Sequence, residues 1–268
     1  MVPRPLFSIV TVTLNCLEDA QRTARSVLSQ SFQDYEYIIK DGGSTDGTLE
    51  NLKSLGLAPL VHKDASVYDA MNQALEYCSG DYVCFLNAGD HFSSNSVLEH
   101  ASEWIRSNDL PDFVYGDVVV LERLPAHPEF RRCISYPSTI SKSYLFRKMI
   151  CHQAWFVKKS MYNDLGCFNT AYRYAADYDF LLKNIVSGNT RFSHFPFFIV
   201  NYKGHGLSST NTEASASEKH HIQIDYYSPI EIFILGYVGQ LMSFLAVNIL
   251  YKIYPYISSG WRARLNGR

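Results

Sequence analysis

The chain has 268 residues, which suits one large α/β domain with a thick core and is short for two full domains. Hydrophobic residues make up 47% and charged residues 19%, a composition typical of a globular protein and not of a disordered one. The formal net charge of -2 provides no global basic field, so a nucleic-acid polymer is not an expected partner. The aromatic content of 14% is somewhat high and indicates aromatic-lined pockets or contact with a membrane as much as an aromatic core.

The cysteines and the N-terminal stretch indicate a reducing compartment. Six cysteines are scattered without a C-x-x-C pair or a regular spacing, which predicts free thiols rather than a disulfide scaffold or a zinc site. The opening "MVPRPLFSIVTVTLN" lacks the charged n-region, long apolar region and cleavage site of a signal peptide. It is typical of a first β-strand, and we expect a cytoplasmic chain.

The first half of the chain alternates between strand-length apolar runs and segments with helical spacing of apolar residues. The predicted strands are Phe7 to Leu14, Tyr35 to Lys40, Pro59 to His62 and Tyr82 to Asn87. The predicted helices are Leu17 to Gln30, Thr48 to Leu55 and Tyr68 to Cys78. This alternation predicts a parallel sheet covered on both faces, in which ligands bind beyond the carboxyl ends of the strands.

The second half is less regular and predicts that the sheet becomes mixed. The expected strands there are Phe113 to Leu121, Gln153 to Val157 and Arg191 to Asn201, and the expected helices are Lys158 to Asp164 and Asp177 to Val186. From 204 to 217 the residues are polar and small, which predicts a mobile loop.

Two acidic loops follow predicted strands. In "IIKDGGSTDGT", Asp41 comes directly after a strand, and Gly42 and Gly43 remove side chains where a ligand can approach the backbone. A carboxylate in this place can accept a hydrogen bond from a nucleobase or a ribose hydroxyl, whereas Asp46 can equally be a helix cap. There is no G-x-G-x-x-G and no G-x-x-x-x-G-K-[ST], so neither a dinucleotide fingerprint nor a Walker loop is present.

The second loop, in "CFLNAGDHF", places Asp90 after another strand, and the two acidic strand ends should converge on one edge of the sheet. A nucleoside diphosphate bound there would add negative charge, which a hard divalent cation, Mg²⁺ or Mn²⁺, would offset through oxygen ligands. We predict Asp90 as a metal ligand; a turn-capping aspartate is the alternative.

These motifs together resemble those of family 2 glycosyltransferases of the GT-A fold. "FSIVTVTLN", "IIKDGGSTDGT", "SVYDAMNQALEYCSGDYVCFLNAGD" and "AADYDFLLK" occur in the order and at the approximate spacing of that family. The resemblance covers roughly residues 5 to 209. It implies a single αβα domain with a mixed, mainly parallel sheet that binds a nucleotide sugar, and an inverting sugar transfer helped by a divalent metal.

The resemblance also implies the donor site. The residues expected to bind the nucleotide sugar are Thr13, Asn15, Asp41, Ser44, Asp69, Asn72 and Asn87. The chain departs from the family at "NAGD", where Asn87 and Gly89 replace two expected acids of the D-x-D-type metal motif and leave Asp90 alone.

For catalysis, an inverting transfer needs a general base within reach of the acceptor hydroxyl. The resemblance makes Asp177 the predicted base, although Ala176 replaces the usual preceding Glu, and Asp179 is the second choice. A helix N-terminus would favour the ionised form of Asp177, and a simple N-cap is the alternative for it.

Three further side chains are candidates for the site. His205, in a Gly-flanked loop that could close over the donor, is the second predicted metal ligand, and Lys203 is nearby. His152 starts a predicted strand and is a candidate for the acceptor side, with a structural role as the alternative for each histidine.

The C-terminal segment predicts membrane contact. The stretch "IFILGYVGQLMSFLAVNIL", residues 232 to 250, has 19 residues without a formal charge, and basic residues follow it. We therefore predict a GT-A domain over residues 1–228 and a hydrophobic helical segment with a basic tail over 229–268, peripheral on the cytoplasmic face of the membrane. A helix that closes the domain core or forms a dimer is the alternative.

The predicted function is transfer of a sugar, with UDP favoured as the carrier, to a hydroxyl of a glycan or polyprenyl-diphosphate-linked oligosaccharide in surface polysaccharide synthesis. This acceptor class is an implication of the resemblance. A non-catalytic sugar-binding or partner-binding module on the same fold, favoured by the reduced "NAGD", and a sugar nucleotidyltransferase are the alternatives. A nucleotidyltransferase needs a Gly-rich, basic loop after the first strand, where this chain has "TLNCLEDAQR".

Overall fold

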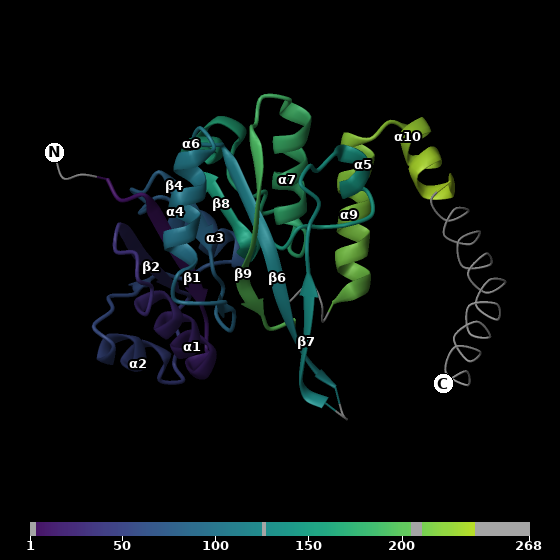
Figure 1. Cartoon of the computed structure of the whole chain (residues 1–268). Coiled ribbons are helices and arrows are strands. Elements are labelled where there is room, and N and C mark those ends of the chain that lie inside the picture. The colour runs from purple at the N-terminus through teal and green to yellow at the C-terminus, as the bar shows by residue number, and fades with distance from the viewer. Residues whose placement is uncertain (1–3, 125–126, 205–210, 239–268) are drawn as a thin grey trace, which may run out of the picture. The chain divides into compact units, whose positions relative to one another are not determined.

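The computed structural model describes residues 4–124, 127–204 and 211–238 (Figure 1). The chain divides into two compact units, Met1–Lys219 and His220–Arg268. The first unit holds the sheet, and the domain boundary after residue 228 stays a prediction.

Strands of the first unit form one sheet in the order β3-β2-β1-β4-β8-β6-β9-β5, with β7 paired to β6. Their bounds are β1 Phe7–Thr13, β2 Tyr35–Asp41, β3 Leu60–Val61, β4 Tyr82–Phe85, β5 His91–Phe92, β6 Phe113–Leu124, β7 His127–Ile134, β8 Trp155–Lys158 and β9 Phe192–Tyr202. Strands β1 to β4 pair in parallel, β8 pairs antiparallel with both β4 and β6, and β9 is parallel to β6. The predicted mixed, mainly parallel sheet is confirmed, because β1, β2, β3, β4, β6 and β9 all run in the same direction.

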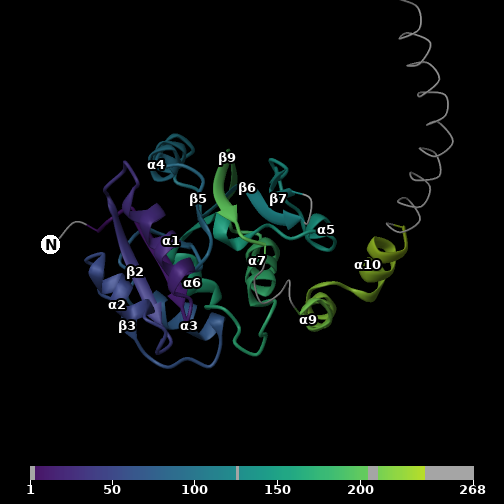
Figure 2. The ribbon, with the colours of Figure 1, turned by 90° about the horizontal axis from the view of Figure 1, so that it is seen from below.

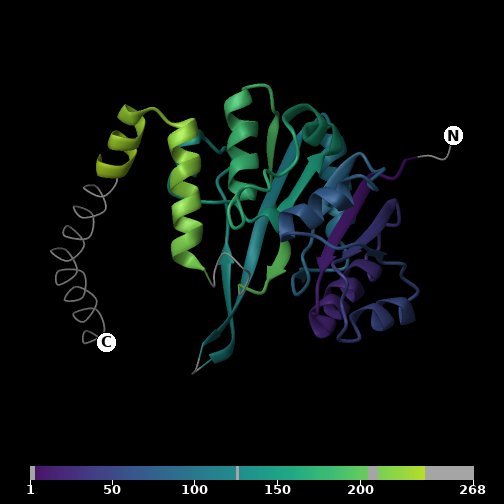
Figure 3. The same ribbon diagram turned by 180° about the vertical axis from the view of Figure 1, so that it is seen from behind.

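Helices cover both faces of this sheet. The helices of the first unit are α1 Leu17–Leu28, α2 Thr48–Ser54, α3 Val67–Leu75, α4 Val97–Ser107, α5 Lys142–Leu145, α6 Lys159–Leu165 and α7 Ala176–Ser187, with a short 3-10 helix at His152–Ala154, and helix α9 spans Thr212–Tyr226. Seen from below, α4 lies on one side of the strands and α3 and α7 on the other (Figure 2). From behind, α7 and α3 cover the face that is turned toward the viewer (Figure 3). The predicted αβα layering is thus confirmed.

The local sequence explains these elements. All seven residues of β1 are buried, as expected of a strand covered on both faces. Helix α1 buries Ala20, Ala24 and Val27 along one stripe and carries acids in its first turn. Helix α3 begins after Ser66, whose side chain accepts a hydrogen bond from the backbone N–H of Asp69. The buried residues of β1 and α1 thus occur at the spacing expected of a strand covered on both faces and of an amphipathic helix.

Several sequence-based expectations for the second half need correction. Helix α4 and strands β5 and β7 were not expected, and His152–Ala154 is a 3-10 helix where a strand start was predicted. Residues 212–226 form helix α9, not the mobile loop that was expected as far as residue 217. The six cysteines all lie among the described residues and are free thiols, as predicted.

In the second unit the described chain ends soon after a short helix. Helix α10 spans Pro229–Phe233 and begins with a capping box between Ser228 and Glu231, and a π-helical turn, Ile234–Val238, follows it. Most of the predicted hydrophobic segment, from residue 239 on, lies outside the described residues. None of the described helices is long and apolar enough to cross a membrane.

Candidate functional site

The edge of the sheet where the parallel strands end gathers most of the predicted side chains. Thr13 ends β1 and is the register partner of Asp41, which ends β2. The fully buried Asp41 carboxylate accepts hydrogen bonds from Thr13 Oγ1 (2.7 Å), Ser44 Oγ (2.6 Å) and the backbone N–H groups of Gly43 (2.8 Å) and Ser44 (2.6 Å). Burial raises the pKa of Asp41, but hydrogen bonds from Ser44, Thr13 and Gly43 outweigh it and hold the pKa below its ordinary value.

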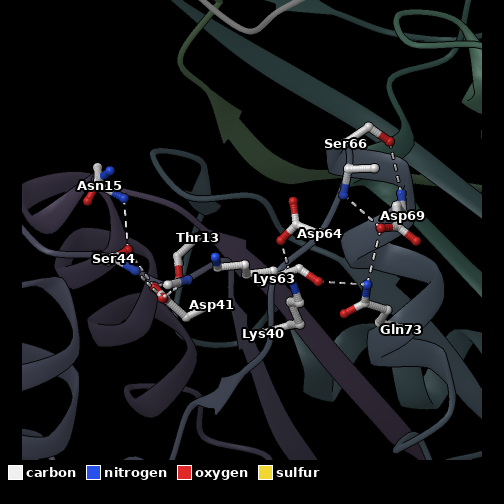
Figure 4. Close-up of polar contacts among 12 residues, drawn as sticks. Thr13, Asn15, Lys40, Asp41, Ser44, Lys63, Asp64, Ser66, Asp69 and Gln73 are labelled. Carbon is white, nitrogen blue, oxygen red and sulfur yellow. Dashed lines mark hydrogen bonds and ion pairs between the residues drawn. The ribbon is translucent and has the colours of Figure 1, made fainter.

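Asn15 and Ser44 connect the loop after β1 to the loop after β2 (Figure 4). The backbone N–H of Asn15 donates to Ser44 Oγ at 2.8 Å, and Asn15 Oδ1 accepts the backbone N–H of Thr45 at 2.8 Å. Asn15 has a φ of 48°, a left-handed conformation that asparagine tolerates better than most residues. In this geometry Asp41 and Ser44 hold the loop together, and the exposed Asn15 faces solvent beside them.

Gly42 and Gly43 each disfavour a side chain, for different structural reasons. A Cβ on Gly42 would lie 2.8 Å from the carboxylate of Asp64, and Gly43 has a φ of 101° that disfavours side chains. Asp64 forms an ion pair with the buried Lys40, the residue before Asp41 on β2. The sequence prediction missed this pair, although "KDAS" after the third strand carries an acid at a third strand end.

Asp69 and Asn72 on helix α3 turn away from the other predicted residues. The carboxylate of Asp69 accepts the backbone N–H of Ala65 (2.8 Å) and the amide of Gln73 (3.1 Å), as Figure 4 shows. Asn72 donates to the carbonyl and accepts from the N–H of Phe168. Both line a cavity of about 330 Å³ that the other predicted residues do not reach. The structure does not bring them to the edge pocket with Asn87, and their part in the donor site stays a prediction.

A second pocket, of about 210 Å³, lies at the carboxyl edge of the strands. We call it the edge pocket. Its walls come from the ends of β1, β4 and β9, the start of α3, the 3-10 helix and the loop before α7. Its lining residues are Val12, Cys16, Val67, Tyr68, Asn87, Ala88, His152, Gln153, Arg173, Tyr174 and Tyr202. Of the residues predicted to bind the nucleotide sugar, Asn87 alone lines it.

Asp177 lies behind the wall of the edge pocket, in the first turn of α7 as predicted. Its Oδ1 atom accepts the hydroxyl of Tyr68 at 2.9 Å, and its Oδ2 atom lies 2.9 Å from His152 Nδ1. The side chain is 15% exposed. Burial raises the pKa of Asp177, but the hydrogen bond and charge of His152 and the hydroxyl of Tyr68 outweigh it and keep the pKa below its ordinary value. The carboxylate is therefore ionised near neutral pH.

His152 extends this hydrogen-bonded chain into the pocket. Its Nε2 atom lies 3.2 Å from the amide nitrogen of Asn87, whose buried Oδ1 atom has no hydrogen-bond partner among the described residues. Strand β8 runs opposite to β4, so the residues just before β8 reach the edge where β4 ends. This topology explains how His152, distant in the sequence, meets Asn87. Asp179, the second candidate base, instead forms an ion pair with Lys183 and does not line the pocket.

Asp90 is buried next to the pocket. Its carboxylate accepts the Gln153 amide (2.9 Å) and the backbone N–H of Lys203 (2.9 Å), while Lys203 Nζ binds Asp19 at 2.6 Å. Burial raises the pKa of Asp90 to about 6. No Lys or Arg in the described part of the chain forms an ion pair with it. The other predicted metal ligand, His205, lies outside the described residues.

The loop before α7 is held by a carboxylate that the sequence did not indicate. Glu218 on α9 accepts the consecutive backbone N–H groups of Arg173 (2.8 Å), Tyr174 (2.7 Å) and Ala175 (3.0 Å). Arg173 and Tyr174 line the edge pocket. Glu218 thereby fixes the backbone of one pocket wall.

The structure thus brings Thr13, Asn15, Asp41, Ser44, Asn87, Asp90 and Asp177 to one edge of the sheet and leaves Asp69 and Asn72 elsewhere. Tyr68, Gln153, Arg173, Tyr174 and Tyr202 are wall residues that sequence reasoning missed. The sequence could have indicated Tyr68 as an alternative to Asp69 in "SVYDAMN". Consecutive residues of a helix lie on different faces, so only one of these two neighbours can face the pocket.

The αβα fold with polar side chains at the carboxyl ends of parallel strands defines a GT-A-type protein. The profile of Glycosyl transferase family 2 matches residues 8–166, more than half of the chain. The chain belongs to this family, as the motifs predict. A PGL/p-HBAD biosynthesis glycosyltransferase of Mycobacterium bovis is 32% identical over 214 residues, which cover 77% of this chain and 80% of the relative. A chondroitin synthase of Pasteurella multocida is 27% identical over 231 residues, 82% of this chain and 23% of that protein.

Solved structures share the fold at low identity. S. aureus TarS 1–349 in complex with UDP-GlcNAc has a TM-score of 0.65 and 18% identity, and the match covers 85% of this chain and 66% of that one. The mannosyltransferase PcManGT of Pyrobaculum calidifontis, in complex with GDP-Man and Mn²⁺, has a TM-score of 0.57 and 15% identity, with coverage of 96% and 84%. These similarities show the GT-A-like fold.

Proposed function

We propose that the chain is an inverting glycosyltransferase that moves a sugar from a nucleoside diphosphate, UDP above all, to a hydroxyl of a glycan or lipid-linked oligosaccharide in surface polysaccharide synthesis. The observation that carries the proposal is the hydrogen-bonded chain from Tyr68 through Asp177 and His152 to Asn87 on the wall of the edge pocket. The complex of TarS with UDP-GlcNAc and the mycobacterial relative, named for PGL/p-HBAD biosynthesis, support the donor and a glycoconjugate product.

The donor nucleoside is proposed to bind beside Thr13, Asn15, Asp41 and Ser44. The paired loops after β1 and β2 are locked by Asp41, so the backbone that a base would contact is already ordered before binding. Preorganisation of this kind reduces the entropy lost on binding. From there the diphosphate would extend past the end of β4, toward Asn87 and the edge pocket.

The base is proposed to lie at the Asp177 centre, which consists of Asp177 and its hydrogen-bond partners Tyr68 and His152. In an inverting transfer the acceptor oxygen attacks the anomeric carbon while the diphosphate leaves with its electron pair, and a base takes the acceptor proton. The ionised Asp177 and its partner His152 are the groups of this centre that can receive it. Tyr68, Tyr174 and Tyr202 line the pocket and would limit the access of water to the reacting atoms.

A divalent cation, Mg²⁺ or Mn²⁺, is proposed to bind between Asp90 and the diphosphate. No group of three or more His, Cys, Asp and Glu in the described ranges could hold a metal by itself. Magnesium at nucleotide sites uses one or two carboxylates with phosphates and water, so a single aspartate is compatible with it. The buried Asp90 forms no ion pair with a Lys or Arg among those residues and fits such a cation. When bound, the ion would offset the charge that the departing diphosphate gains.

The exposed apolar residues of the second unit support a proposed contact with a membrane surface. Ile230, Phe233, Ile234 and Tyr237 are between 49% and 71% exposed. Co-sedimentation of the full chain with vesicles of anionic phospholipid tests this proposal. Binding that Phe233→Ser together with Tyr237→Ser weakens would support it, and recovery of all wild-type protein in the supernatant would reject it.

Release of nucleoside diphosphate from a panel of UDP-sugars and GDP-mannose, with and without Mn²⁺, tests the activity. We expect turnover with at least one UDP-sugar, more with Mn²⁺ than without it, and a smaller effect of Mn²⁺ in Asp90→Asn. Absence of turnover with every donor, under conditions in which UDP raises the melting temperature, would instead favour a binding module.

A further inference from the structure

A pocket of about 530 Å³ lies at the amino edge of the sheet, opposite to the edge pocket. Strands β1 and β4 are parallel and begin there, and the antiparallel β8 ends there with Lys158, the register partner of Tyr82. Its volume lies in the range of small-molecule sites, about 300–1,000 Å³. We call it the amino-edge pocket. It shares no lining residue with the edge pocket, so the proposed donor site leaves it without a role.

Cationic side chains outnumber carboxylates on the wall of the amino-edge pocket. Arg4, Lys158 and Lys159 line it, together with one carboxylate, that of Asp81. Neither Arg4 nor Lys159 forms an ion pair with any residue in the described ranges. Lys159 Nζ donates a hydrogen bond to the carbonyl of Cys78, and an ammonium group has three N–H donors. The guanidinium of Arg4 and the remaining donors of Lys159 are therefore open to a ligand.

Lys158 has an acidic partner, but that partner is shared. Its Nζ atom lies 2.8 Å from Asp112 Oδ1, and Arg191 Nε lies 3.3 Å from Asp112 Oδ2. Burial raises the pKa of Asp112, but the hydrogen bonds from Lys158 and Arg191 outweigh it and lower the pKa to about 2. One ionised carboxylate thus faces two cations, and the group of three keeps a net positive charge.

Neutral hydrogen-bond donors complete the wall. The side chains of Ser160 and Asn163, both on α6, line the pocket and form no hydrogen bond with another residue in the part of the chain that the structure describes. A hydroxyl and an amide can both donate to a ligand oxygen. A divalent cation would need several oxygen ligands, and Asp81 is the one carboxylate among the described lining residues. The wall therefore fits an anion with several oxygen atoms better than a metal ion.

We propose that the amino-edge pocket is a second ligand site and that it binds a phosphate ester such as a sugar phosphate. A guanidinium binds two phosphate oxygens through parallel N–H donors, and an ammonium binds a third as a point charge, which are the roles of Arg4 and Lys159. A phosphate ion alone would leave much of the pocket of about 530 Å³ empty, so the ligand carries an organic part. Hydroxyl groups of that part would meet Ser160 and Asn163.

Calorimetric titration of the full chain with glucose 6-phosphate tests this site. The pocket variant, Arg4→Gln with Lys159→Gln, removes two positive charges from the wall. The control variant, Arg25→Gln with Lys53→Gln, removes the same charge from exposed positions in the last turns of α1 and α2. We expect the Kd for glucose 6-phosphate to rise at least about tenfold in the pocket variant and to stay within about twofold of wild type in the control.

Three comparisons show whether the site recognises phosphate and is separate from the donor site. Glucose should not bind measurably, inorganic phosphate should compete with glucose 6-phosphate, and the Kd for UDP should be unchanged in both variants. Arg4→Gln alone changes an exposed residue and so should leave the fold intact. It should still raise the Kd for glucose 6-phosphate at least about threefold, which keeps the test valid if the double variant unfolds.

A phosphate ester can be soluble or form part of a lipid headgroup, and co-sedimentation with vesicles that contain phosphatidic acid separates the two sources. Vesicle binding that the pocket variant loses and the control keeps, without binding of glucose 6-phosphate, would support the phosphate site and assign it to a headgroup. Three results would overturn the proposal: no binding of either probe by the wild-type chain, an equal loss in the control variant, or a loss of UDP affinity that parallels the loss for glucose 6-phosphate.

Discussion

Nδ1 of His152 lies 2.9 Å from Oδ2 of Asp177, so the start of α7 and the segment before β8 meet through one hydrogen bond at the carboxyl edge of the sheet. The contact joins residues that are 25 positions apart in the sequence and places a fixed imidazole on the wall of the edge pocket. Asp177 also accepts a hydrogen bond from Tyr68, and His152 also contacts Asn87.

The Tyr68 hydroxyl should tune the Asp177 centre. Tyr68→Phe removes the donor at 2.9 Å from Asp177 and leaves the ring in place. We expect a fall in kcat of about fivefold to twentyfold, because one hydrogen bond to a charged group is worth about 1.5–3 kcal/mol and its loss is partly compensated by water. Steady-state kinetics checks this. Tyr115→Phe, which loses a hydrogen bond to the carbonyl of Pro137 outside the pocket, is the control and should keep its kcat. Equal kinetics in the two variants would contradict the role of Tyr68.

Asp41 should stabilise the fold in a pH-dependent way. Its pKa is lower in the folded chain than in the unfolded one, so it contributes stability above its unfolded pKa of about 3.9 and loses it as the pH falls through the folded value. We expect Asp41→Asn to lower the free energy of unfolding by about 1–3 kcal/mol at pH 7, and the difference from wild type to shrink below about pH 4.

Urea unfolding at several pH values measures this difference. Asp34→Asn changes an exposed aspartate and serves as the control, with stability close to wild type at each pH. A difference between wild type and Asp41→Asn that stays constant from pH 7 to pH 3 would show that the carboxylate charge is not responsible.

Glu218 should control the order of one pocket wall. Glu218→Ala leaves the N–H groups of residues 173–175 without their carboxylate. We expect faster hydrogen exchange at these amides and a KM for the donor raised several-fold, because the wall must be ordered again on binding. Glu213→Ala, on the exposed part of α9, should change neither. Unchanged exchange at 173–175 in Glu218→Ala would contradict this account of the wall.

The first half of the fold could be predicted from sequence because local patterns decide it. Strand β1 was expected at Phe7 to Leu14 and spans Phe7–Thr13, and β2 and β3 begin and end within a residue or two of their predicted bounds. Helix α4 was missed although Val97, Leu98, Ala101 and Ile105 form a buried stripe at helical spacing. Helix α9 has no such stripe, and the contacts that Glu218 makes with the loop before α7 come from tertiary structure.

The candidate site could be predicted only where residues follow parallel strands. Asp41 is the last residue of β2 and Asn87 follows β4 by two residues, so the common edge of the sheet could be inferred from the sequence. The meeting of His152 with Asp177 depends on the direction of β8, which no local pattern encodes. Asp69 was assigned to the donor site by resemblance, and in the structure its carboxylate accepts the backbone N–H of Ala65, just before its own helix.

The central claim is that sugar transfer occurs at the Asp177 centre, and kcat with a UDP-sugar in Asp177→Asn, measured together with the Kd for UDP, tests it most directly. The account predicts a kcat at least about 100-fold below wild type with a Kd within about threefold, because the group that supports proton transfer is lost while the nucleoside site is intact. A kcat equal to that of the wild-type chain would contradict it.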